Sequence, residues 1–282
     1  MAFALLDSLS LPGDPSKPNE DAFAAEACAA VVLDGATPLN PPLLPGKSDA
    51  AWIAAFGARR LMAHLKDGDR PRAALHHALA DAEHSFAGLR RRPPREGFEM
   101  PCASMMLAVE RVDGLDLLWY GDCTALLLRP DGACAVFGEA FDKRAAEAGE
   151  AARFLKETGL APVEALVRAE YLPLFRTARN KVNGPGGSWL FSPVAAASEH
   201  VSRARADAPP GTLVLLCTDG FLVLAGDYGA YGPKTLVEAA AEKGLIRLGE
   251  ELRDVEESDP EGRRHPRFKK SDDATAVLLR LS

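Results

Sequence analysis

Short apolar runs rich in Val, Leu and Ala recur along the chain, each bounded by Gly, Asp or Pro. Runs this short, with such boundaries, are typical of buried strands. Two turn signals join neighbouring runs, Asp113-Gly114 and Pro130-Asp131-Gly132, and predict an antiparallel meander in the middle of the chain rather than a βαβ series. We expect strands at residues 28–33, 104–112, 115–120, 124–129, 133–137, 212–217 and 274–281.

Helical periodicity fills much of the remaining sequence. Residues 49–66 and 72–89 each keep large apolar side chains near one face, and Ser48 or Asp49 is a candidate cap for the first helix. Residues 233–255 are rich in strong helix formers and predict a third helix. Strands followed by helices, without regular alternation, favour an α+β fold in layers.

The segment 139–200 interrupts this order, because it is first charged and helix-like and then Gly-rich. We predict that it is a flap inserted between strands. The chain of 282 residues, 47% hydrophobic and 26% charged, suits a globular protein. We therefore expect residues 1–282 to form a single domain that carries this flap.

Composition also limits the partners. A net charge of -7 argues against nucleic acid, and we expect the basic stretch at residues 263–270 to be a solvated loop. No apolar run approaches the roughly 20 residues that cross a bilayer. Asp7 also lies where a signal peptide would need an uninterrupted apolar stretch. Five cysteines without CxxC spacing predict buried, reduced thiols. We expect a cytoplasmic protein that binds no membrane.

Acidic residues stand where the expected strands begin or end. One Asp-Gly alone is an ordinary turn. A carboxylate at the rim of the core has an unfavourable desolvation free energy unless a nearby cation offsets it. Five such junctions therefore indicate a shared cation site. Hard oxygen ligands without a His or Cys cluster favour Mg²⁺ or Mn²⁺ over Zn²⁺. A pair of such ions suits phosphate-ester hydrolysis. The junctions are Asn19-Glu20-Asp21, Asp34-Gly35, Gly121-Asp122, Asp219-Gly220 and Asp272-Asp273.

In order and spacing, these motifs resemble those of the metal-dependent type 2C protein phosphatases, the PPM superfamily. The motifs are N-E-D-A, V-L-D-G, G-D, C-T-D-G and S-D-D-A-T-A-V, and they extend from Asn19 to Leu281. The resemblance implies a sandwich of two antiparallel β-sheets flanked by helices. It also implies two ions, or three, and hydrolysis by metal-bound water.

The resemblance assigns roles to residues at matching positions. Asp34 would bridge both ions as the central catalytic ligand, and the Gly35 carbonyl and Glu20 would complete the second ion's protein ligands. Asp219 and Asp272 would hold the first ion, and Asp122 would join Asp219 around a weaker third ion. Asp21 and Asp273 would lie in the outer shell.

The chain departs from the family at two positions. Asp34-Gly35 is followed by Ala36, so the His proposed there as general acid is absent, and loss of a proton donor costs about 10²- to 10⁴-fold. The family's phosphate-binding Arg is Ser16 here. Lys17, Arg176 and Arg179 are alternative phosphate anchors, although a solvated loop explains the two arginines equally well.

Two functions therefore remain open. The first is a metal-dependent phosphatase that hydrolyses phosphoserine, phosphothreonine or small phosphate monoesters, with a phosphoprotein or a small phosphate ester as substrate. The second is a catalytically weak or inactive relative that regulates a phosphorylated partner or binds metal. Retention of every motif carboxylate favours the enzyme.

Overall fold

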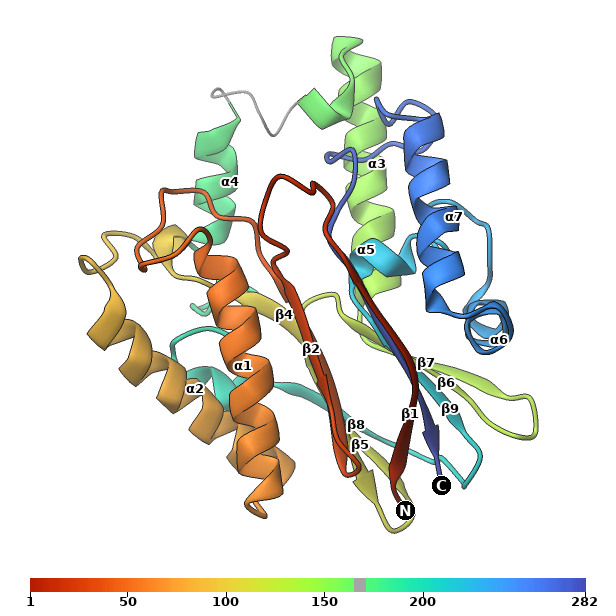
Figure 1. Cartoon of the computed structure of the whole chain (residues 1–282). Coiled ribbons are helices and arrows are strands. Elements are labelled where there is room, and N and C mark those ends of the chain that lie inside the picture. Colours follow the sequence, from red (N-terminus) through yellow and green to blue (C-terminus); the bar gives the residue numbers. More distant parts are fainter. Residues whose placement is uncertain (165–170) are drawn as a thin grey trace.

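The computed structural model describes residues 1–164 and 171–282, and in them ten strands form two five-stranded antiparallel sheets (Figure 1). The first sheet has the order β1 (Phe3–Leu11), β10 (Ala274–Leu281), β9 (Leu213–Cys217), β6 (Thr124–Leu128) and β7 (Cys134–Phe137). The second sheet has the order β2 (Asp21–Ala25), β3 (Ala29–Gly35), β4 (Ala103–Arg111), β5 (Gly114–Tyr120) and β8 (Ser202–Ala206).

Seven helices of the described residues pack outside the sheets. Near the second sheet are α1 (Asp49–Lys66) and α2 (Pro71–Leu89), and near the first are α5 (Asp219–Leu222), α6 (Pro233–Lys243) and α7 (Leu245–Ser258) (Figure 1). The predicted flap contains α3 (Ala140–Thr158) and α4 (Leu172–Arg179). Short 3₁₀ turns lie at Gly97–Glu99, Pro162–Glu164 and Ala195–His200.

Alternation along the strands makes three apolar layers. In β3, Val31 and Leu33 pack against α1 and α2, while Val32 points between the sheets. Val214 and Val277 of the first sheet meet Val32 there. Because successive side chains point to opposite faces, a continuously apolar strand such as β3 must be covered on both sides. The sequence expectation of a two-sheet sandwich flanked by helices is confirmed.

Three details of the sequence expectation were wrong. The middle of the chain is not one meander, because β5 belongs to the second sheet and β6 to the first, so the chain crosses between sheets at Gly121-Asp122. Residues 233–255 form two helices, since Gly244 adopts a φ of 83° between α6 and α7. Strands β1 and β8 and helices α4 and α5 were not predicted.

Candidate metal centre

The strand register brings the acidic motifs to one end of the sandwich. Asp21 at the start of β2 pairs with Asp34 at the end of β3, and Asp34 pairs with Ser104 of β4. In the first sheet, the end of β9 pairs with the start of β10. Asp219, just after β9, and Asp272, just before β10, therefore lie at the same end of this sheet. Antiparallel pairing therefore brings together residues that are far apart in the sequence; Ser10 and Thr275, for example, share a hydrogen bond across 265 positions.

Hydrogen bonds connect these strand ends across the two sheets. The Thr218 hydroxyl donates to Asp21 Oδ2 at 2.9 Å, and Ser104 Oγ donates to Asp122 Oδ1 at 2.5 Å. Asp273 accepts from the backbone N–H of Glu20 at 2.5 Å and of Gly13 at 2.7 Å. Asp273 therefore holds the loop that carries Glu20.

Two motif glycines let backbones approach closely at this end. A Cβ added to Gly35 would lie 2.6 Å from the Glu20 carbonyl oxygen and 2.7 Å from the Ala50 carbonyl oxygen. A Cβ added to Gly220 would lie 2.0 Å from the Asp273 carbonyl oxygen. The glycines of the V-L-D-G and C-T-D-G motifs are thus required by packing between the segments that carry the acids.

Burial and mutual repulsion disfavour the ionised acids. Burial, and then the nearby charges of Asp21 and Asp219, raise the pKa of Asp34 well above its usual value. Burial and the Asp122 charge raise the pKa of Asp219 to about 6. Burial also raises the pKa of Glu20 and of Asp21. Carboxylates with such raised pKa values are stabilised in their charged form by a bound cation.

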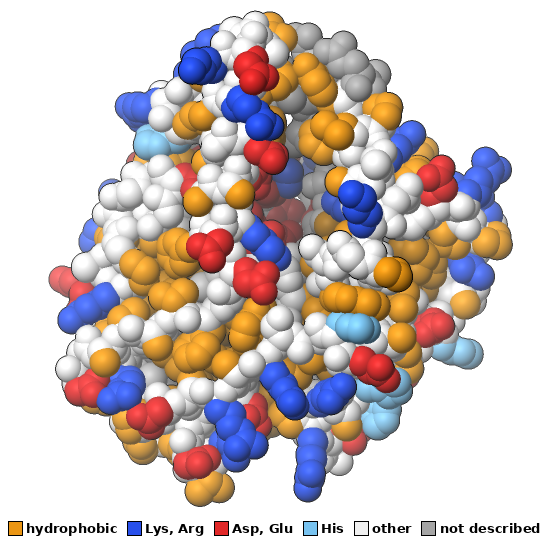
Figure 2. Space-filling view, turned by 180° about the vertical axis from the view of Figure 1, so that it is seen from behind, with side chains coloured by type: hydrophobic (Ala, Val, Ile, Leu, Met, Phe, Trp, Pro, Cys, Tyr) orange, Lys and Arg blue, Asp and Glu red, His pale blue; other side chains and the backbone are white. Residues whose placement is uncertain are grey.

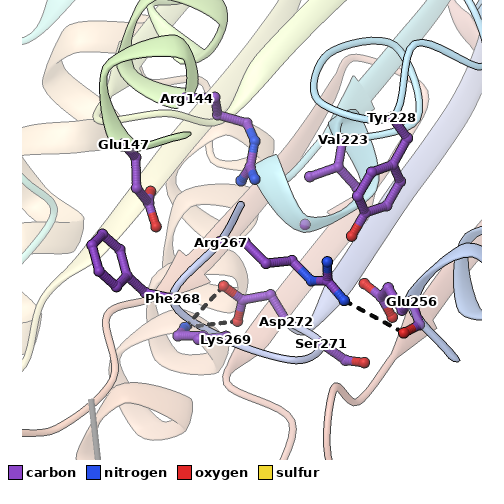
Figure 3. A pocket seen from close by; sticks show the side chains of 11 residues that line it. Arg144, Glu147, Val223, Tyr228, Glu256, Arg267, Phe268, Lys269, Ser271 and Asp272 are labelled. Atoms are coloured by element: carbon purple, nitrogen blue, oxygen red, sulfur yellow. Dashed lines mark hydrogen bonds and ion pairs between the residues drawn. The ribbon is translucent and has the colours of Figure 1, made fainter. Parts of the chain in front are cut away.

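Two basic side chains enter the acidic cluster, and neither was predicted as a site residue. Lys269 Nζ contacts both oxygens of Asp272, at 2.8 and 2.9 Å, from the loop before β10. Arg144 reaches in from α3 (Figure 3). It donates to Asp219 Oδ2 at 2.7 Å and to Asp227 Oδ2 at 2.6 Å. The carboxylates outweigh burial and raise the pKa of both side chains.

A small cavity of about 30 Å³ adjoins these contacts, lined by Arg144, Glu147, Lys269 and Asp272 among others (Figure 3). The basic stretch 263–270 was expected to be a solvated loop, which is wrong for Arg267. Arg267 is buried against Asp259, and Lys269 pairs with Asp272, because the loop folds back over α5 and α7. In Figure 2, acidic side chains lie at the bottom of a hollow.

The donor set fits hard divalent cations. Six carboxylates (Glu20, Asp21, Asp34, Asp122, Asp219 and Asp272) face two basic side chains, and Asp21 Oδ1 is buried with no hydrogen-bond partner among the described residues. Among those residues, no three of the acids bring oxygen atoms within 4.8 Å of one another. Oxygen ligands of one Mg²⁺, at about 2.0–2.1 Å from the ion, lie within about 4.2 Å of one another, so three of these acids can bind one ion only after their side chains move closer together.

The three predicted phosphate anchors lie in different surroundings. Lys17 is exposed and pairs with Asp14 at 3.4 Å. Arg176 donates to the Leu39 carbonyl oxygen at 2.8 Å and lies over the Phe98 ring. Arg179 contacts Cys102 Sγ at 3.7 Å and lines a second cavity beside Ala36 and Pro38, which directly follow the Asp34-Gly35 turn. Of the three, Arg179 is the best placed to face this turn.

Comparisons with solved structures find the same architecture. The serine/threonine phosphatase PstP/Ppp of Mycobacterium tuberculosis aligns with a TM-score of 0.58 and 18% identity, covering 100% of both chains. The catalytic domain of PstP with two manganese ions aligns with a TM-score of 0.56 and 17% identity, covering 100% of this chain and 99% of that one. The PPM Ser-Thr phosphatase MsPP of Mycobacterium smegmatis, in complex with cacodylate, aligns with a TM-score of 0.58 and 16% identity, covering 99% and 100%.

No protein-family model matches the chain, and no curated protein does. The likeness is therefore one of structure, and it extends over the whole length of the chains compared. The two five-stranded antiparallel sheets of this chain, flanked by helices, align with the fold of these solved structures. The chain has the fold of the PPM-type Ser/Thr phosphatases.

Proposed function

We propose that the chain is a metal-dependent phosphatase of the PPM superfamily that hydrolyses phosphoserine, phosphothreonine or small phosphate monoesters. The observation that carries the proposal is the excess of carboxylates over basic side chains at one end of a PPM-type sandwich. Such an excess is costly in a buried place unless divalent cations bind there. A regulatory, non-catalytic relative would not need to retain so many buried carboxylates.

The proposed ligands follow the motifs. Asp34, the Gly35 carbonyl and Glu20 would hold one Mg²⁺ or Mn²⁺, and Asp34, Asp219 and Asp272 would hold another. Asp122 would share a third ion with Asp219, and Asp21 and Asp273 would act from the outer shell. When bound, the ions supply an activated water and neutralise the phosphoryl oxygens.

The chain's own residues would orient the phosphate. Arg144 and Lys269 are the basic groups in contact with the proposed ligands, at 2.7 Å from Asp219 and 2.8 Å from Asp272. Cations that replace them at the carboxylates would leave both groups free to bind phosphate oxygens. We keep Lys17, Arg176 and Arg179 as further candidates, and Arg179 has the best position.

The remaining proposals concern organisation and location. We propose that residues 1–282 form one domain in which the 139–200 segment acts as a flap, since its helix α3 carries Arg144 to the acidic cluster. In the described residues, no helix is long and apolar enough to cross a membrane. Five free thiols support a reducing compartment, which we propose to be the cytoplasm, and the charge of -7 supports partners other than nucleic acid.

Hydrolysis of p-nitrophenyl phosphate and of a phosphothreonine peptide by the purified chain, with Mn²⁺ or Mg²⁺, tests this function. Asp34→Asn keeps the side-chain shape and should reduce kcat by at least about 10²-fold. Multi-site Mn²⁺ binding in calorimetry without turnover on either substrate would instead support the regulatory relative. Neither binding nor turnover would reject both functions.

A further inference from the structure

A second cluster of ligand-type side chains lies far from the acidic motifs in sequence, on the hairpin of α1 and α2. Its members are His64 in the last turn of α1, Asp69 in the connecting turn and His77 in α2. Nδ1, Nε2 or carboxylate oxygen atoms of the three all lie within 4.8 Å of one another. Among the described residues it is the one group of three His, Cys, Asp or Glu side chains that meets this distance.

The hairpin places these side chains on a rigid base. Leu61 and Leu65 of α1 and Leu75 of α2 are buried in the same apolar cluster, which packs the helices together. Gly68 adopts a φ of 95° in the turn, where an L side chain is rarely tolerated. Residues held on packed helices lose little entropy when they bind a ligand.

His64 has a carboxylate near each ring nitrogen. Its Nε2 lies 2.7 Å from Asp81 Oδ2, and its Nδ1 lies 3.6 Å from Asp69 Oδ2. A neutral imidazole that donates from Nε2 turns the Nδ1 lone pair towards the Asp69 carboxylate, so two acceptors face each other. A cation between them removes this conflict.

The spacing suits a four-coordinate ion. Asp69 Oδ2 lies 2.7 Å from His77 Nδ1 and 3.6 Å from His64 Nδ1. Ligand atoms of a tetrahedral Zn²⁺ with bonds near 2.0–2.1 Å are about 3.3 Å apart, so small side-chain movements would form the site. The His77 side chain is 51% exposed, which leaves room for a water as fourth ligand.

An outer shell is already present. Asp81 accepts from His64 Nε2 and also from Arg60 Nε at 2.7 Å. A carboxylate that holds the far nitrogen of a ligating His fixes its tautomer and makes it a better ligand. Arg60 lies 3.4 Å from His64 Nε2 and balances the Asp81 charge, so the whole group bears little net repulsion towards an incoming cation.

We propose that His64, Asp69 and His77 bind one Zn²⁺, or a similar borderline transition ion, with a water as fourth ligand. The ion joins the end of α1 to α2 and has a structural role. Imidazole nitrogens distinguish this site from the all-oxygen acidic centre, which suits Mg²⁺ or Mn²⁺. The proposal is independent of the phosphatase function.

Calorimetric titration of the tag-free full chain with Zn²⁺, in excess Mg²⁺ to occupy the oxygen sites, tests the proposal. We expect one Zn²⁺ per chain in the wild type and at least 10-fold weaker binding in His77→Gln. His84→Gln, an exposed position on the same helix, is the matched control and should bind as the wild type does. Equal Zn²⁺ affinity in wild type and His77→Gln, or no stoichiometric binding in the wild type, would overturn the site.

A second variant tests the outer shell. Asp81→Asn removes no proposed ligand, and loss of such a partner typically weakens metal binding about 10- to 100-fold. Circular dichroism of each variant verifies the helical fold. If Asp81→Asn and His77→Gln are folded and both bind Zn²⁺ as tightly as the wild type, the cluster is only a hydrogen-bond network between the helices.

Discussion

Lys269 occupies both oxygens of Asp272 and therefore competes with any ion there. We expect Lys269→Met to tighten Mn²⁺ binding by about 10-fold, because a charge-assisted contact of roughly 1.5 kcal/mol no longer has to be broken. Calorimetry measures the change. Lys270→Met is the control, since this exposed neighbour contributes the same charge without the contact. Equal tightening in both variants would indicate a general charge effect.

Glu99 shows how one buried acid contributes to stability with a known pH dependence. Its carboxylate accepts two hydrogen bonds from Arg92, which are the main cause that lowers its pKa to about 2. The folded pKa lies below the ordinary 4.5, so the stabilisation is present above pH 4.5 and is lost as the pH falls towards 2.

We expect Glu99→Gln to lower the free energy of unfolding by about 2 kcal/mol at pH 7, as for a hydrogen bond to a charged group. The difference from the wild type should shrink between pH 4.5 and 2. Urea denaturation at several pH values measures it. A difference that stays constant over this range would show that the charge of Glu99 has no part in it.

The acidic residues could be predicted from sequence because each stands beside a strand, and strand ends in an antiparallel sandwich meet. Arg144 and Lys269 could not be found this way. Arg144 lies within a charged helix, where no local pattern says which basic side chain turns inward. Lys269 lies three residues before Asp272, a spacing that permits the contact but is common among exposed pairs.

At the scale of elements, Asp7 of β1 links the first sheet to the start of α7. Its Oδ2 accepts from the Leu245 backbone N–H at 2.7 Å, which satisfies a donor that the helix itself leaves unpaired. We expect Asp7→Ala to reduce the free energy of unfolding by about 1 kcal/mol, the usual value of such a cap. Thermal unfolding measures it. Asp254→Ala, at an exposed position of α7, should have a smaller effect, and an equal loss would contradict the capping role.

The sequence predicted the type of most elements but not every boundary between them. Helix α1 begins and ends where its periodicity indicated, at Asp49 and Lys66. Strong helix formers lie on both sides of Gly244, so helix propensity predicted one continuous helix there. Propensity does not indicate that Gly244 adopts a positive φ, which separates α6 from α7. Strand β8, S-R-A-R-A, carries polar residues as a sheet edge does, so it lacks the apolar run used to find strands.

At the scale of the molecule, ions at the acidic centre should stabilise the whole fold. Mn²⁺ at 100 times its dissociation constant adds about 2.7 kcal/mol per site, which raises Tm by roughly 5–10 °C for a chain of this size. EDTA should reverse the rise. In Asp34→Asn the Mn²⁺-induced rise in Tm should be much smaller. Without metal, however, this variant should have a higher Tm than the wild type, because a buried acid with a raised pKa has been removed. Equal Mn²⁺-induced rises in both proteins would contradict Asp34 as a ligand.

The position of β10 has a consequence for how the molecule is made. This strand, the last of the described strands, lies inside the first sheet between β1 and β9, and Asp272 lies two residues before its start. A ribosome-bound chain can pair β9 with β6, but β1 has no neighbour in that sheet until residues 274–281 emerge. The same segment therefore closes the first sheet and brings Asp272 to the acidic cluster, so neither can form before residues 272–281 have been synthesised.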